Sequence, residues 1–146
     1  CLVRDALAPD CRIVGVQSSA APAAHRAWRT GEPTSHPSRT RVAGLAVGAS
    51  FALTQSILRR SLDDFILVGD DEILRAVGLM STHAHTLAEG AGAASLAGLM
   101  ADSARGSAPG GPCAVICTGG NADDGELAGL AGQAGQAGAA SLTEAA

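Results

Sequence analysis

A short run of residues towards the carboxyl end of the chain combines polar side chains with two glycines. Residues 114–117 form an unbroken apolar run that follows four turn-forming residues, 109–112. This pattern predicts a short strand that is buried on both faces. Residues 118–121, with the sequence Thr-Gly-Gly-Asn, come directly after it. Because open α/β sheets bind ligands just beyond the carboxyl ends of their strands, the Thr118 hydroxyl and the Asn121 amide are candidate ligand-binding groups.

The same four residues also have a purely structural interpretation. Glycine followed by asparagine is common in turns, so the segment could be an ordinary exit from a strand. In that case the Thr118 hydroxyl would cap a local turn and bind no ligand. Gly119 and Gly120 fit both interpretations, since glycine permits a tight turn and also lets a ligand lie against the backbone. The spacing of these residues alone leaves both interpretations open.

A second candidate group, Glu89, begins a segment that is built almost entirely from small residues. Residues 89–100 include three glycines, Gly90, Gly92 and Gly98. Each glycine disfavours a helix by about 1 kcal/mol relative to alanine, so the three glycines need a reason. Close packing against a sheet or a cofactor would supply one. Glu89 itself is either a carboxylate that needs a partner in an apolar setting or an ordinary helix cap on the surface.

The elements that would position these groups alternate along the chain. Apolar runs predict strands at residues 12–17 and 65–68, in addition to the one at 114–117. Helices are predicted over residues 20–30 and from Asp70 onwards. Strands that alternate with helices predict an α/β fold, doubly wound, with a mostly parallel sheet and flanking helices.

Several shorter features complete this outline. Residues 42–47 are a further apolar run, which could be a strand or an extended segment. Ser50 is a candidate N-cap for the helix that follows it. Trp28, the only tryptophan, is expected to anchor the 20–30 helix. One face of the helix that Asp70 caps is expected to carry four packing residues: Ile73, Val77, Met80 and Ala84.

Composition restricts the classes of function. The 146 residues suffice for one domain, and the net charge of −4 comes with no basic stripe for a nucleic acid or a membrane surface. No apolar run is long enough to span a membrane and no signal peptide leads the chain, which predicts a cytoplasmic protein. Cys113 and Cys117 are expected to be small buried thiols, because no CxxC motif indicates zinc or a disulfide framework.

The basic residues show one unusual feature. All ten are arginine, and the chain contains no lysine. The chain also starts at Cys1, in a stub that reads as the end of a helix, and we expect it to be a fragment of a longer protein. Residues after Asn121 change character: 123–125 read as a turn, and 130–140 repeat alanine, glycine and glutamine in a low-complexity sequence.

Taken together, the segments resemble the second half of the catalytic domain of serine/threonine dehydratases. These are pyridoxal-phosphate lyases of the tryptophan-synthase-β fold type. The resemblance runs from about residue 11 to residue 123, which implies a catalytic part at 1–124 and a low-complexity tail at 125–146. It is carried by five motifs in matching order: Ile-Val-Gly-Val-Gln at 13–17, Gly-Leu-Ala-Val at 44–47, Leu-Asp-Asp-Phe-Ile-Leu-Val-Gly-Asp-Asp-Glu-Ile at 62–73, Ala-Glu-Gly-Ala-Gly-Ala-Ala at 88–94 and Thr-Gly-Gly-Asn at 118–121.

The resemblance implies roles for individual residues. Thr118 matches the hydroxyl residue that hydrogen-bonds the pyridine nitrogen of the cofactor. Glu89 matches the acidic residue that begins the helix beside the ring. The remaining positions implied to bind pyridoxal 5'-phosphate are Gly44, Gly119, Gly120 and Asn121.

Some features of the family are absent from this chain. The Schiff-base lysine, the substrate-carboxylate loop and the glycine-rich phosphate cradle are expected before the position of Cys1, so the isolated chain is expected to be inactive. Some relatives hold a divalent cation with carboxylates at the positions of Gln17 and Ala23, and neither residue is a carboxylate here. No metal site is therefore expected. Ala43 replaces the usual acidic residue before Gly44.

The implied reaction is dehydration and deamination of L-threonine or L-serine to a 2-oxo acid and ammonia. The expected partners are a small amino-acid substrate, the missing amino-terminal half and, in the complete enzyme, a second copy of the chain in a homo-oligomer. Neither a nucleic acid nor a membrane is expected as a partner. Two alternatives remain open: an amino-acid racemase or hydroxyaspartate dehydratase on the same scaffold, and a non-catalytic half-domain that binds a partner chain.

Overall fold

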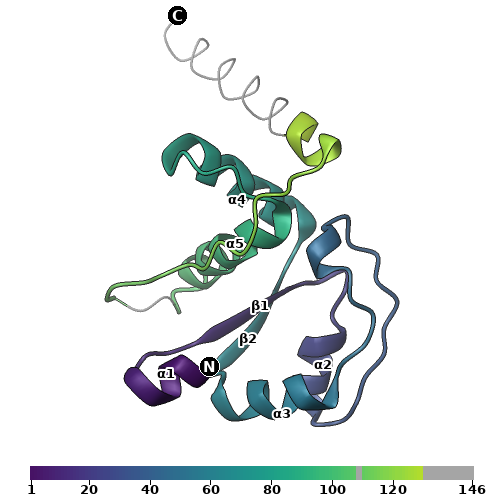
Figure 1. Cartoon of the computed structure of the whole chain (residues 1–146), viewed down its shortest axis with the longest axis vertical. Coiled ribbons are helices and arrows are strands. Elements are labelled where there is room, and N and C mark those ends of the chain that lie inside the picture. Colours follow the sequence, from purple (N-terminus) through teal and green to yellow (C-terminus); the bar gives the residue numbers. More distant parts are fainter. Residues whose placement is uncertain (108–109, 130–146) are drawn as a thin grey trace, which may run out of the picture. The chain divides into compact units, whose positions relative to one another are not determined.

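The structure, a computed structural model, describes residues 1–107 and 110–129. The chain divides into two compact units, Cys1–Asp70 and Asp71–Ala146, and each is described by itself. The first unit contains the sheet, and the second contains two long helices with the segment that follows them (Figure 1).

A parallel pair of strands forms the centre of the first unit. β1 (Val14–Ser18) pairs with β2 (Asp64–Val68) in a register that aligns Val14 with Asp64 and Ser18 with Val68. Two further backbone hydrogen bonds extend the ladder: the Asp63 N–H donates to the Ile13 carbonyl and the Ser19 N–H to the Val68 carbonyl. Parallel pairing needs a crossover connection, and helices supply it here. The predicted α/β class with a parallel sheet is confirmed, and the strand predicted at residues 12–17 begins two residues later than expected.

The crossover begins with α2 (Ala23–Thr30), which packs on β2. Pro22 stands at its N-cap, and Gly31 ends it in the left-handed conformation with φ 84°. Trp28 anchors the helix as predicted: its ring meets Phe65 edge to face at 6.0 Å, and its indole N–H donates to the Leu58 carbonyl at 3.3 Å.

The second half of the crossover differs in detail from the prediction. Residues 42–47 contain a 3₁₀ turn, η1 (Ala43–Leu45), and not a strand. Phe51, not Ser50, stands at the N-cap of α3 (Ala52–Ser61). The Ser50 hydroxyl is engaged elsewhere, because it accepts the Thr34 N–H at 2.8 Å.

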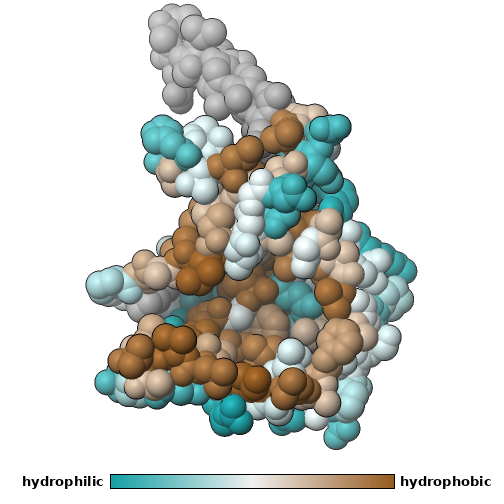
Figure 2. All heavy atoms as spheres, viewed as in Figure 1, coloured by the Kyte–Doolittle hydropathy of each residue, from teal (hydrophilic) through white to brown (hydrophobic). Residues whose placement is uncertain are grey.

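Apolar side chains remain exposed in the first unit along α1 (Leu2–Leu7) and the start of α3 (Figure 2). Two contacts join α1 to the end of α3: Arg4 donates to the Ser61 carbonyl, and the Ser61 hydroxyl donates to the Asp5 carboxylate at 3.0 Å. The large exposed apolar residues along these two segments are Leu2, Val3, Leu7, Phe51 and Leu53.

Two helices dominate the second unit. α4 runs over Asp70–His83 and buries Ile73, Val77 and Met80, as the periodicity predicted. Ala84 lies beyond the end of the helix and is exposed, so its assignment to the packing face was wrong. α5 (Gly90–Ala104) buries a stripe of small residues that allows close approach of neighbouring backbone: Gly90, Gly92, Ala93, Ala94, Ala97 and Gly98, with Asp102 beyond them.

The strand predicted at residues 114–117 is absent from the described structure. The segment forms neither a strand nor a helix, and Ile116 is 68% exposed. A strand is defined by pairing with a neighbour, and the described sheet consists of β1 and β2 alone. The prediction that Cys113 and Cys117 are buried thiols is wrong for the same reason, because both are exposed.

The end of the described chain also differs from the prediction. Residues 124–129 are helical, so the turn expected at 123–125 is the start of a helix. The low-complexity repeat at 130–140 lies outside the described residues, and the division into 1–124 and 125–146 stays a prediction. Within the part of the chain that is described, no helix is long and apolar enough to cross a membrane.

Candidate functional site

The start of α5 and the loop at residues 118–121 form one contact within the second unit. The Glu89 N–H donates to the Gly119 carbonyl at 3.1 Å. Gly92, the third residue of the helix, lies so close to the Gly119 backbone that a Cβ on Gly92 would collide with the Gly119 carbonyl oxygen. We call this arrangement the Gly92–Gly119 contact. It gives Gly92 a close-packing reason to be a glycine in this helix.

The loop is pressed against this surface on two further sides. A Cβ on Gly119 would overlap the Glu89 carboxylate, so the Glu89 side chain occupies the space that a side chain at 119 would need. A Cβ on Gly120 would approach the Leu87 carbonyl oxygen at 2.7 Å. Packing against backbone therefore favours glycine at 120, whereas a side chain at 119 would have to displace the Glu89 carboxylate. Neither glycine has a positive φ angle. Three of the candidate residues that the sequence singled out, Glu89, Gly119 and Gly120, therefore lie close together in the structure.

Thr118 presents a weakly engaged hydroxyl beside this contact. The residue is exposed, and its hydroxyl lies 3.5 Å from the Ala91 carbonyl oxygen, at the outer limit for a hydrogen bond. The hydroxyl hydrogen can therefore turn towards another acceptor at little cost. Asn121, the last residue of the loop, is also exposed.

Sequence reasoning missed Glu126, which ties the end of the loop to α5. One carboxylate oxygen accepts the Gly90 N–H, the first of the helix, at 2.7 Å. The other accepts the Asp123 N–H at 3.3 Å, while the Asp123 carboxylate accepts the Glu126 N–H at 2.9 Å. This reciprocal pair has the geometry of a capping box, and the spacing Asp-x-x-Glu could have predicted it. A carboxylate at a helix N-terminus is also favoured by the helix dipole.

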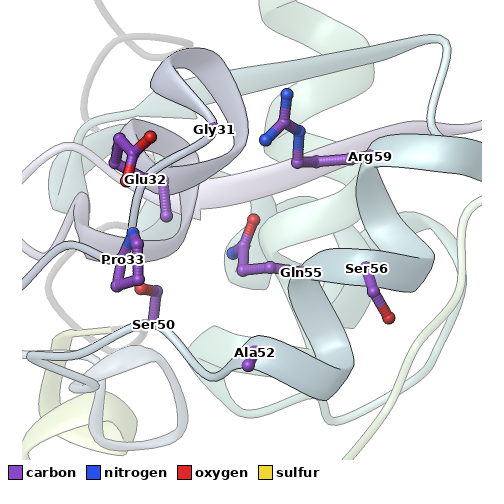
Figure 3. A pocket seen from close by; sticks show the side chains of 9 residues that line it. Gly31, Glu32, Pro33, Ser50, Ala52, Gln55, Ser56 and Arg59 are labelled. Carbon is purple, nitrogen blue, oxygen red and sulfur yellow. The ribbon is translucent and has the colours of Figure 1, made fainter.

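Gly44 belongs to the first unit and lies in η1, where it is exposed. Its grouping with Thr118 and Glu89 therefore stays a prediction. The first unit also has a small cavity of about 250 Å³ beside α2 and α3 (Figure 3). Gln55 and Arg59 line it with seven further residues, none of them a predicted site residue. Among residues 1–107 and 110–129, no cluster of three or more His, Cys, Asp or Glu side chains could hold a metal ion.

Comparison with known protein families gives a match over residues 2–119. These residues match the sequence profile of the family described as pyridoxal-phosphate dependent enzyme. The L-threonine ammonia-lyase of Geobacter sulfurreducens is 34% identical over 79% of this chain and 28% of the relative. The catabolic L-threonine dehydratase TdcB of Escherichia coli K12 is 33% identical over 63% of this chain and 28% of the relative.

Solved structures give the same fold. A threonine deaminase from T.th. superimposes with a TM-score of 0.74 at 32% identity, over 83% of this chain and 43% of that protein. A serine racemase from Dictyostelium discoideum superimposes with a TM-score of 0.76 at 26% identity, over 84% of this chain and 39% of that protein. The chain spans less than half the length of these relatives.

Proposed function

Since the chain belongs to the pyridoxal-phosphate dependent enzyme family, we propose that it is part of an enzyme that dehydrates and deaminates L-threonine or L-serine. The products would be a 2-oxo acid and ammonia. Relatives named as threonine ammonia-lyase or threonine dehydratase support this substrate class. The complete enzyme would take a small amino acid as substrate and would assemble as a homo-oligomer.

The observation that carries the proposal is the Gly92–Gly119 contact with the Thr118 hydroxyl beside it. A flat aromatic ring with a polar nitrogen needs a surface free of side chains and one hydrogen-bonding group at its edge. Gly119 and Gly120 contribute no side chains of their own, although Glu89 and Leu87 occupy the sides on which their Cβ atoms would stand. The hydroxyl of Thr118, loosely held at 3.5 Å from the Ala91 carbonyl oxygen, offers the hydrogen-bonding group. The residues present therefore fit the pyridine ring of pyridoxal phosphate, and Asn121 and Gly44 are proposed to complete its surroundings.

When bound, pyridoxal phosphate supplies a conjugated ring that withdraws electrons from the α-carbon of the substrate. Thr118 would donate its hydroxyl hydrogen to the ring nitrogen. Because a neutral hydroxyl transfers no proton to that atom, Thr118 would keep the electron withdrawal moderate, whereas a carboxylate in its place would favour a protonated nitrogen. Moderate withdrawal favours loss of the β-hydroxyl group over a long-lived charge at the α-carbon. Glu89 would lie beside the ring and hold Gly119 through its backbone N–H.

The covalent attachment of the cofactor has to come from outside these 146 residues. The chain contains no lysine, so it holds no side-chain amine that could condense with an aldehyde. We therefore assign this step to a lysine in the part of the relatives that the chain does not span. On this assignment the 146-residue chain alone has no activity.

Substitutions of Thr118 test the proposal in a chain restored to the length of its relatives. Thr118→Ser should keep the hydrogen bond and most of the activity. Thr118→Ala should lower activity, because an enclosed polar atom without its partner costs roughly 1–3 kcal/mol. Thr118→Asp should change the outcome itself, by favouring a protonated ring nitrogen and shifting products from elimination towards racemisation or transamination. The measurement is the ratio of 2-oxo acid released to substrate epimerised, at equal cofactor occupancy.

A matched control separates this role from a merely structural one. Thr86→Asp places the same charge on another exposed threonine of the second unit and should leave the product ratio unchanged. If Thr118→Asp binds the cofactor and also leaves the ratio unchanged, the assignment of Thr118 to the ring nitrogen is wrong. Epimerisation as the main reaction of the unmodified enzyme would instead identify a racemase. Cofactor binding without turnover of any amino acid would identify a non-catalytic half-domain.

A further inference from the structure

Three hydrogen-bond donors from two segments of the first unit converge on the carboxylate of Asp70. The Ser18 hydroxyl donates to Oδ1 at 2.7 Å, and the Thr40 hydroxyl donates to the same oxygen at 2.7 Å. The Arg41 N–H donates to Oδ2 at 2.8 Å. Ser18 is the last residue of β1, and Asp70 follows β2 by two residues. The carboxylate therefore joins the carboxyl ends of both strands to residues 40–41, which come from the long connection between them.

The hydrogen bonds continue from Asp70 into η1. The Thr40 hydroxyl, which donates to Asp70, accepts the Val42 N–H at 3.1 Å. Val42 stands at the N-cap of η1, and its side chain is buried. The Leu45 N–H then donates to the Val42 carbonyl at 3.0 Å. Gly44 lies inside this turn, so its backbone position depends on a chain of contacts that starts at Asp70.

Only an ionised carboxylate suits this position. Three donors share two oxygens, and an amide would turn an N–H group towards at least one of them. The Asp70 side chain is only 12% exposed. Burial acts to raise the pKa of Asp70, but hydrogen bonds from Ser18, the Arg41 backbone and Thr40, with the charge of Arg41, outweigh it and hold this pKa below its ordinary value. The group is therefore an anion at neutral pH.

We propose that Asp70 is a positioning residue, which fixes residues 40–45, and with them Gly44, against the carboxyl ends of β1 and β2. The sequence marked Asp70 only as a helix start, and its partners Thr40 and Ser18 lie 30 and 52 positions away. That Gly44 faces the cofactor rests on the proposed function. That Asp70 fixes the segment around Gly44 rests on the hydrogen bonds alone.

Hydrogen exchange of a chain restored to the length of its relatives, measured without any cofactor, tests the first part. Asp70→Asn should accelerate exchange about tenfold in a peptide that covers residues 40–47, because the loss of charged hydrogen bonds releases the Arg41 and Val42 amides. Exchange in α2 should stay unchanged. Asp10→Asn removes the same charge from an exposed position of the first unit and should leave residues 40–47 as they are. If Asp70→Asn unfolds the unit, Thr40→Val, which removes one donor, should still give the local effect.

Cofactor affinity tests the second part in a chain restored to the length of its relatives. Asp70→Asn should weaken binding of pyridoxal phosphate about tenfold, with an altered fluorescence spectrum, at a temperature where both proteins are folded. Equal exchange in Asp70→Asn and Asp10→Asn, or acceleration spread over the whole first unit, overturns the positioning role. Faster local exchange with unchanged cofactor affinity would mean that Asp70 stabilises the segment but does not position it for the cofactor, which also overturns the positioning role. A chain that binds no cofactor in any variant refutes the proposed function but leaves the exchange result intact.

Discussion

Protonation of His25 opposes folding of the first unit. Burial, with the charges of Arg29 and Arg26, lowers the pKa of this imidazole, and the Asp64 carboxylate and the Phe65 backbone offset only part of the effect. The ring packs edge to face on Phe65 at 5.5 Å, and its Nδ1 atom is buried without a hydrogen-bond partner. A proton on Nδ1 would therefore be a buried donor with no acceptor.

This arrangement predicts a loss of stability in mild acid. The folded-state pKa lies below the unfolded value of about 6.5, so the contribution of neutral His25 is fully present above that pH. It is lost as the pH falls through the lower folded-state pKa. The urea midpoint of unfolding should therefore decrease as the pH is lowered from 7.5 to 5. His25→Phe should reduce this pH dependence. His83→Gln, at an exposed histidine, is the control, and an equal dependence in all three proteins would contradict the prediction.

Asp70 titrates in a different range and does not interfere with this test. Its pKa is also lowered, but from the ordinary aspartate value of about 3.9. Its stabilising contribution is present above that value and is lost only as the pH falls through the still lower folded-state pKa. Between pH 7.5 and pH 5 the Asp70 carboxylate stays charged, so the two residues can be separated by pH alone.

At the scale of elements, glycine at position 92 lowers the helix propensity of α5 but permits close packing. Alanine at position 92 would favour the helix by about 1 kcal/mol. Its Cβ, however, would meet the backbone of Gly119, which cannot rotate away as a side chain would. Glycine at 92 therefore serves the loop and not the helix.

This conflict makes a prediction for Gly92→Ala. The loop should move off the helix and break the hydrogen bond from the Glu89 N–H to the Gly119 carbonyl, while the interior of α5 stays folded. Amide exchange resolved by NMR should show the Glu89 N–H exchanging several-fold faster, with amides at 96–102 as protected as before. Gly111→Ala, where a Cβ meets open space, should change neither. Unaltered exchange at Glu89 in Gly92→Ala would show that the loop does not need this glycine.

Local sequence patterns predicted the elements that bury their own apolar face. β2 and α4 were recognised because their burial follows directly from the spacing of apolar residues. Residues 114–117 were misassigned because an apolar run predicts burial, whereas a strand also needs a neighbour to pair with. The Asp70 contacts could not be predicted, since donors 30 and 52 positions away leave no local pattern. For the site, the sequence singled out Glu89 and Gly119, but not the Glu126 carboxylate that joins the loop to α5.

At the scale of the whole molecule, the chain exposes more apolar surface than a stable single domain usually does. Leu2, Val3, Leu7 and Leu53 are each at least 65% exposed, and the described sheet has only two strands. The 146-residue chain on its own should therefore bind a hydrophobic dye and melt over a broad temperature range. Calorimetry with dye fluorescence measures both, with the chain restored to the length of its relatives as the control. A sharp two-state transition of a monomer, with no dye bound, would contradict this expectation.

The parallel pairing of β1 with β2 has a kinetic consequence. Paired residues lie 50 positions apart, as Ile13 and Asp63 do at the edge of the ladder. Closing a loop of that length costs roughly 3.5 kcal/mol of chain entropy before the first strand contact forms. Contacts so distant in sequence slow folding, because the entropy is lost before the contacts compensate for it. The helices α2 and α3 shorten the effective loop once they pack on each other, so their association is expected to precede strand pairing. Formation of the sheet, and with it the closing of Asp70 on Thr40 and Ser18, is then the late and slow event in folding of the first unit.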